Sequence, residues 1–169
     1  VNKVSEAAGN SSAASQVSIA DLNAITGLDN EILANLTAYQ AAIVEVVNKV
    51  DLNDVAKIQT LIDSVNTTEA NNAASTAAIT KVSEAATNGN EANVSIADLN
   101  AIIGLTNQDA ANLAAYQTAI AAVTDKADLN DVAKIQALIN TVNTTEANNA
   151  ASAAAVNKVS EAAGNSSAA

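Results

Sequence analysis

The 169-residue chain contains no cysteine, histidine, tryptophan, phenylalanine, proline, arginine or methionine. Without cysteine and histidine it lacks the ligands that zinc and copper prefer, and a serine nucleophile has no histidine to act as its base. Without arginine it cannot form the bidentate clamp that commonly holds phosphate. We therefore predict that the protein is not an enzyme and has no catalytic, cofactor-binding or metal-binding residues and no cofactor. Because methionine is missing, we also expect a processed product or an internal piece of a longer chain.

Basic residues are scarce as well. Seven lysines stand against 18 aspartates and glutamates, which gives a formal net charge of −11 and a pI near 4.1. Nucleic acids and anionic lipids are bound through basic surfaces, so we expect no nucleic acid as a partner. The uninterrupted apolar runs, such as Ala41 to Val44, are far shorter than the roughly 20 residues that span a bilayer, and we expect no membrane insertion.

What the sequence does contain is repetition. Residues Val1 to Ala14 recur without change as Val156 to Ala169, and Val17 to Thr80 matches Val94 to Asn157 at 46 of 64 positions. Self-similarity at a fixed period is typical of units that stack on their neighbours. With 49% hydrophobic residues the chain is also too apolar for a disordered segment.

These periods predict an all-α fold made of tandem helical-bundle repeats of about 77 residues that form an elongated array. We expect residues 1–16 to be the end of a preceding repeat, comprising a connector helix tail and a loop. Residues 17–93 would form repeat 1, and residues 94–169 would form repeat 2 and run into the start of the next. If separate copies form a continuous polymer, Val1 to Ala14 and Val156 to Ala169 should have the same fold.

Each repeat begins with a short helix signal. Ser18 is followed three residues later by Asp21, the pattern of a capping box, and Gly27 can close the segment in a left-handed conformation. A longer helix is expected from near Asn30, because its apolar residues are spaced by three and four positions: Ile32, Leu36, Tyr39, Ile43, Val46 and Val50.

Two further helices complete the predicted repeat. The third is expected to have Asp51 as its cap, and the fourth is rich in alanine and is expected to begin at Thr67 or Thr68 and to end near a glycine such as Gly89. Alternating β-branched runs are absent, so we predict no strand. The residues expected to pack in the core are Leu22, Leu36, Tyr39, Ile43, Val55, Ile58, Ile62 and Val65, with their partners 77 positions later.

Acidic and amide side chains gather at Asp51, Asn53 and Asp54, and again 77 positions later. Their oxygens could bind Ca²⁺, but the stretch lacks the glycine turn of a calcium loop and leads directly into a helix. Helix capping is therefore the favoured interpretation, with calcium binding as the alternative.

Tyr39 and Tyr116, the only aromatic residues, occupy equivalent positions. We expect each to fill the core with its hydroxyl at the rim; a sugar-stacking role is the alternative. The segment TTEANNAAS, identical at Thr67 and Thr144, is explained by a threonine cap and a polar helix face, with a recognition motif as the alternative. Triplets that match the N-glycosylation pattern begin at Asn10, Asn35, Asn66, Asn93, Asn143 and Asn165, of which the first, fourth and sixth lie in predicted loops.

Three segments carry a resemblance: VSIADLNAI-x-GL, NLAAYQTAI and DLNDVAKIQALINTVN. They resemble the helical repeats of very large bacterial cell-surface and adhesin-like proteins and are loosely similar to three-helix GA/FIVAR-type modules. The match covers Ser18 to Asn66 and Ser95 to Asn143. The resemblance implies an extracellular fibre, filament or stalk at a cell surface, whose partners are neighbouring repeats or copies of itself. A binding module that recognises a host protein or glycan is the alternative.

Overall fold

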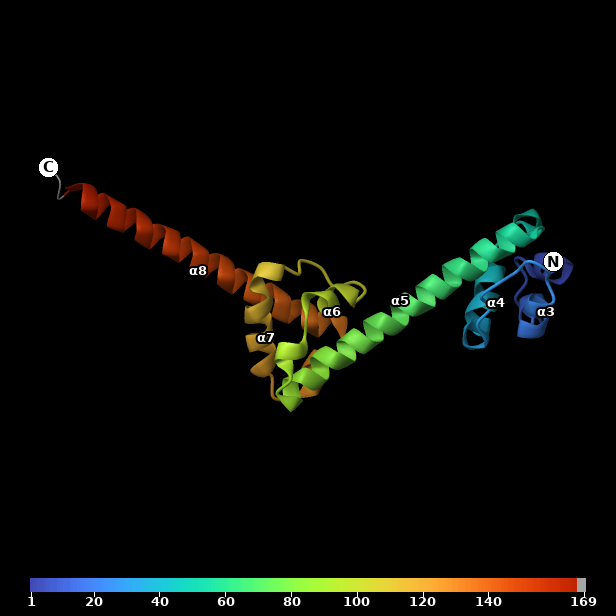
Figure 1. The fold of residues 1–169 in the computed structure, drawn as a ribbon, viewed down its shortest axis with the longest axis horizontal. Coiled ribbons are helices and arrows are strands. Elements are labelled where there is room, and N and C mark those ends of the chain that lie inside the picture. The colour runs from blue at the N-terminus through green and yellow to red at the C-terminus, as the bar shows by residue number, and fades with distance from the viewer. Residues whose placement is uncertain (167–169) are drawn as a thin grey trace. The chain divides into compact units, whose positions relative to one another are not determined.

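The computed structural model describes the backbone of residues 1–166 and the side chains to residue 163. All regular structure within residues 1–166 is helical and none of them lies in a strand, which confirms the prediction of an all-α fold (Figure 1). The residues pack into two compact units, Val1–Asn72 and Ala73–Ala169, which we call unit 1 and unit 2.

Both units are built from the same kinds of element. Unit 1 contains α1 (Asn2–Ala7), α2 (Ser11–Ala14), α3 (Ile19–Asn23), the 3-10 turn η1 (Leu33–Asn35), α4 (Leu36–Glu45), η2 (Lys49–Leu52) and the first part of α5 (Val55–Asn88). Unit 2 contains the rest of α5, η3 (Glu91–Asn93), α6 (Ile96–Ala101), η4 (Ala110–Asn112), α7 (Leu113–Ala121), η5 (Lys126–Leu129) and α8 (Val132–Ser166).

The predicted capping boxes are present. The Ser18 hydroxyl accepts from the backbone N–H of Asp21 at 3.2 Å, and the Asp21 carboxylate accepts from the Ser18 N–H at 2.8 Å. Ser95 and Asp98 form the same pair of bonds at the start of α6. Both helices end before the predicted glycine, and Gly27 has a φ of +86°, which places it in the turn that follows α3.

The second predicted helix is shorter than its apolar pattern indicates. It begins with η1 and continues as α4 only to Glu45, so Ile32 and Val50 lie outside it and are 47% and 53% exposed. Asn30 turns the chain with a φ of +65°, and the Asn48 side chain accepts from the Val50 N–H to begin η2. These two turns cut the amphipathic segment at both ends.

The third and fourth predicted helices are one continuous helix, so the predicted boundary at Thr67 or Thr68 is wrong. The Thr67 hydroxyl donates to the Asp63 carbonyl and the Thr68 hydroxyl to the Ser64 carbonyl, each at 2.9 Å. A threonine that bonds back to the preceding turn leaves the helix intact instead of starting a new one. The expected cap is also displaced, because Asp54 rather than Asp51 accepts from the Lys57 N–H at 2.9 Å.

Most of the predicted core residues are buried. In unit 1 the buried ones are Leu22, Tyr39, Ile43, Ile58 and Ile62, while Val55 and Val65 pack against them and are partly exposed. Leu36 is half-buried and lies outside this cluster. The prediction missed Leu52 and the residues before the first cap, of which Val4, Ala7 and Ala14 are almost fully buried. The core of unit 1 is therefore closed by the segment that precedes its capping box.

The same closure occurs in unit 2, where the second copy of KVSEAA lies at the end of α5. Val82, Ala85 and Ala86 are buried there, in the positions that Val4, Ala7 and Ala8 have in unit 1. After these alanines the chain turns at Gly9 and at Gly89, which have φ values of +68° and +65°.

The third copy of this segment has a different conformation. Val156 to Ala169 repeats Val1 to Ala14, but α8 continues without a turn to Ser166, whereas α1 ends at Ala7. The backbone N–H of Gly9 donates to the Ile43 carbonyl at 3.4 Å, a contact that the turn makes with unit 1. The expectation that the two 14-residue segments share one fold is thus met only in their first helical part.

Candidate functional site

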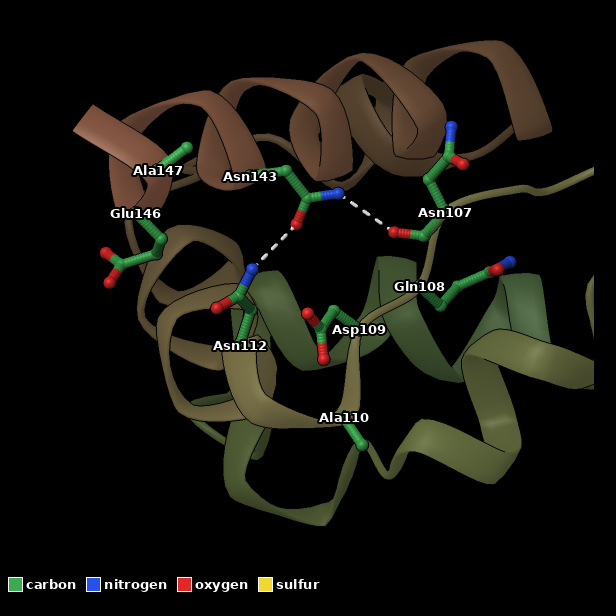
Figure 2. Close-up of a pocket in the computed structure, with 8 residues that line it drawn as sticks. All are labelled: Asn107, Gln108, Asp109, Ala110, Asn112, Asn143, Glu146 and Ala147. Carbon is green, nitrogen blue, oxygen red and sulfur yellow. Dashed lines mark hydrogen bonds between the residues drawn. The ribbon is translucent and has the colours of Figure 1, made fainter. Parts of the chain in front are cut away.

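The most prominent pocket in the described part of the chain is an open groove of about 690 Å³ on unit 2. It lies between the loop that leads into α7 and the middle of α8 (Figure 2). Its lining is polar and carries two carboxylates: Asn107, Gln108, Asp109, Ala110, Asn112, Asn143, Glu146 and Ala147. The chain has no histidine or cysteine, so the groove offers only amide and carboxylate chemistry.

Asn143 of α8 organises one side of this groove. Its side-chain oxygen accepts from the Asn112 amide at 2.9 Å, and its amide donates to the Asn107 carbonyl at 2.8 Å (Figure 2). The hydroxyl of Tyr116 also donates to the Asn143 oxygen, and it accepts from the Asp109 N–H at 3.0 Å. Because the Tyr116 ring is fully buried, these bonds anchor the loop to the core.

Unit 1 contains the same network. Asn66 accepts from the amide of Asn35 and from the hydroxyl of Tyr39, and it donates to the Asn30 carbonyl at 2.8 Å. Tyr39 is fully buried, and its hydroxyl accepts from the Ile32 N–H at 2.9 Å. The interpretation of both tyrosines as core residues is confirmed. Asn30 and Asn107 have φ values of +65° and +63°, a conformation that asparagine tolerates better than most residues.

The rest of the groove is not shared by the two units. Gln108, Asp109 and Ala110 are replaced in unit 1 by Glu31, Ile32 and Leu33. The asparagine and tyrosine network is therefore a device for holding a loop, while the residues that a ligand would meet differ between the units. Sequence analysis identified the tyrosines but missed Asn66 and Asn143 as their partners, because bonded residues lie 27 to 36 positions apart.

At the acidic turns the place of a cation is taken by a lysine. The Lys57 ammonium donates to the Val50 carbonyl at 2.7 Å and to the Asn53 side chain at 3.1 Å, and it pairs with Asp54 at 3.7 Å. Lys134 makes the equivalent contacts with Ala127, Asn130 and Asp131. The backbone N–H of Lys134 bonds to Asp131 and holds the pKa of this carboxyl below its usual value. The capping interpretation accounts for every one of these oxygens.

The capping-box acids also pair with a lysine. Lys3 bonds to Asp21 at 2.6 Å, and this bond, together with those from Ser18, lowers the pKa of Asp21 far below its usual value. Lys81 bonds to Asp98 at 2.7 Å. Burial opposes ionisation of Asp98, but the bonds from Lys81 and Ser95 outweigh it, so its pKa is also lowered. In both units the KVSEAA lysine thus holds the first helix of the unit by its capping residue.

The asparagines of the glycosylation triplets have other tasks. Asn10 accepts from the Ala13 N–H as the cap of α2. The amide nitrogens of Asn35, Asn66 and Asn143 donate hydrogen bonds within the networks above, which a glycan at these atoms would break. Asn93 lies in η3, and the side chain of Asn165 is outside the described residues.

In the described residues, groups of three or more acidic side chains close enough to hold a metal ion do not occur. None of the described helices combines the length and the apolar character needed to cross a membrane. Comparison with protein-family models, with curated proteins and with solved structures finds no match to this chain.

Proposed function

We propose that this chain is a structural region of tandem repeats, extracellular and non-catalytic, that forms a fibre, filament or stalk at a bacterial cell surface. The observation that carries the proposal is that one scheme of packing and hydrogen bonding is built twice from residues 77 positions apart. Tyr39 with Asn66 and Tyr116 with Asn143 are one example, and Lys3 with Asp21 and Lys81 with Asp98 are another.

The distribution of differences between the units supports a structural role. Most positions that fill the cores or hold the loops are the same in both units, whereas the exposed residues beside the groove vary. A repeated active site would require the opposite, because reacting groups have to recur in every copy that works. The high negative charge also suits a surface fibre, since like-charged chains repel one another sideways.

Two measurements on the native source test this proposal. The polypeptide that contains the sequence should have a mass many times 16.9 kDa under fully denaturing conditions. Antibodies raised against residues 1–169 should label intact cells, along filaments or stalks in electron micrographs. Labelling that requires permeabilised cells would contradict the surface role, and a mass near 16.9 kDa would contradict one covalent array of repeats.

One observation favours the binding module as a second candidate. Ile32 and Leu33 are 47% and 67% exposed in unit 1, beside its asparagine and tyrosine network, where unit 2 has Asp109 and Ala110. An exposed apolar pair at one unit only would mark a contact with a host protein or glycan. Binding of the chain to arrayed glycans and to host extracellular proteins, lost in the double variant I32S/L33S, would support this candidate.

A further inference from the structure

The last part of α8 presents an apolar face that nothing in the described residues covers. Val156 and Val159 are 64% and 70% exposed, and every residue from 150 to 163 is exposed. Lys158 lies on the same part of the helix and forms no ion pair with a described residue. An exposed pair of valines flanked by alanines is unusual on a helix of so polar a chain.

The equivalent residues of α5 are buried in unit 2. Val82, which corresponds to Val159, is 0% exposed, and Ile79, which corresponds to Val156, packs against the core of unit 2. The other buried positions of this stretch of α5 are Ser75, Ala78, Ser83, Ala85 and Ala86. Their counterparts Ser152, Ala155, Ser160, Ala162 and Ala163 are all exposed. The same helix face is therefore covered in α5 and bare in α8.

Unit 1 shows a second way of seating this face. Val1 to Ala8 is identical to Val156 to Ala163, and there Val4 is 1% exposed within the core of unit 1. Lys3 pairs with Asp21 at 2.6 Å, as Lys81 pairs with Asp98 at 2.7 Å in unit 2. The sequence at the end of α8 is thus found twice in this structure, each time in contact with the first capped helix of a unit.

The seat on unit 1 is only partly filled by α1. In unit 2 the longer α5 also places Ser75, whose hydroxyl accepts from the Ile103 N–H at 2.9 Å, and Ala101 is partly buried against the core. Helix α1 begins at Asn2 and has no counterpart of Ser75, and Ala24, the equivalent of Ala101, is exposed. A longer helix on this seat would cover more of unit 1 than α1 does.

We propose that the face from Ser152 to Ala163 binds unit 1 of a second copy of this chain, in place of that copy's own α1. Val159 then takes the position of Val4, and Lys158 pairs with the Asp21 of the second copy. This inference rests on the proposed function, because it gives the repeats their end-to-end contact. Since eight of the exchanged residues are identical, the incoming helix restores the packing that α1 gives up, and Ser152 and Ala155 extend it.

The exchange has a defined geometry. The donor face belongs to unit 2 and the seat to unit 1, so the contact is head to tail, and each bound copy still offers a free α8. Contacts of this type produce open chains unless the rotation between copies happens to close a ring. Binding is concentration-dependent, because each added copy loses its freedom to move and has to displace a tethered helix.

Sedimentation of the full 169-residue chain tests the proposal with four variants. The weight-average mass of the wild type should rise with concentration. Val159→Asp should weaken association about 100-fold or more, because the seat would bury an unpaired charge. Asn157→Asp is the matched control: it adds the same charge at a position whose counterpart in α5, Thr80, stays exposed. This control should associate like the wild type.

Val4→Asp provides the reciprocal test. It should release α1 from its seat while leaving Val159 intact, so association should begin at lower concentration than in the wild type, and V4D/V159D should be monomeric. If Val4→Asp unfolds unit 1, the comparison of wild type, Val159→Asp and Asn157→Asp still decides. A wild type that stays at 16.9 kDa at every concentration overturns the proposal, as does association that Val159→Asp leaves unchanged.

A chemical cross-link locates the contact. A carbodiimide joins an ammonium and a carboxylate that touch, and a mixture of isotopically labelled and unlabelled chains should yield a link between Lys158 of one copy and Asp21 of another. An association without this link would place the contact elsewhere and would also overturn the proposal. None of these measurements depends on where the protein is located, so their failure leaves the surface proposal standing, and failure of surface labelling leaves this contact standing.

Discussion

Asn66→Ala removes the centre of the network that holds the loop of unit 1. The side chain makes three hydrogen bonds, with the amide of Asn35, the hydroxyl of Tyr39 and the carbonyl of Asn30. After the substitution the buried Tyr39 hydroxyl keeps the Ile32 N–H as a donor but has no acceptor for its own proton. The loop from Asn30 to Asn35 should then detach from α5 before the rest of unit 1 unfolds.

The size of the effect follows from the three bonds. A buried hydroxyl without an acceptor costs about 1–3 kcal/mol, and the two bonds to the more exposed loop cost less, about 0.5 kcal/mol each, because water can replace them. Alanine recovers roughly 0.6 kcal/mol through its better helix propensity. We expect a loss of about 2–3 kcal/mol in the unfolding free energy of unit 1. Tyr39→Phe should cost about 1 kcal/mol, and the double variant about 1 kcal/mol less than the sum, because both changes remove the same bond.

Native-state hydrogen exchange followed by NMR measures this loss one helix at a time. Amides of α4 should exchange faster in Asn66→Ala, whereas those of α7 should keep their rates. Asn71→Ala, at an exposed position of α5, is the matched control and should change stability by less than about 0.5 kcal/mol. The reasoning is refuted if Asn66→Ala behaves like this control, or if the effects of the two single variants simply add.

Three further predictions concern other parts of the units. Leu22→Ala, at a fully buried position, should cost about 2–5 kcal/mol in urea denaturation, and a loss under about 1 kcal/mol would show that α3 does not pack as described. Gly27→Ala should cost about 1 kcal/mol through its φ of +86°, since only Val55 approaches the added methyl, at 3.9 Å; an unchanged melting temperature would argue against that backbone conformation. The folded pKa of Asp98 is depressed, so its contribution to stability is present above the ordinary value of 3.8 and is lost as the pH falls through the lower folded pKa. The melting temperature should therefore fall in this acidic range, and Asp98→Asn should lessen the fall; an identical pH profile would contradict the role of this carboxylate.

The parts of the fold that depend on neighbouring residues could be predicted from the sequence. The capping box of Ser18 and Asp21 spans three positions, and the spacing of Tyr39, Ile43, Ile58 and Ile62 shows their shared helix faces directly. The break expected at Thr67 was wrong because threonine can cap a helix or bond back within one, and only the surrounding packing decides between the two.

The candidate site and the closure of the cores depend on contacts between distant residues. Asn66 meets Asn30 across 36 positions, and nothing in the local pattern of either residue announces this contact. Val4 was missed because KVSEAA, with one valine and two alanines, contrasts too weakly with its surroundings to mark a buried face. Its recurrence beside each capping box was the signal that could have found it.

Gene duplication and folding act on different pieces of this chain. The sequence period restarts at the caps Ser18 and Ser95, but each core is completed by residues that precede its cap, such as Val4 and Val82. A module excised at the cap, for example Ser18 to Ala86, would leave out the valine and alanines that seal the first core. The inherited unit is thus out of phase with the folding unit, so adding or deleting one period would always splice within a helix and leave every core able to borrow its closing segment from the period before.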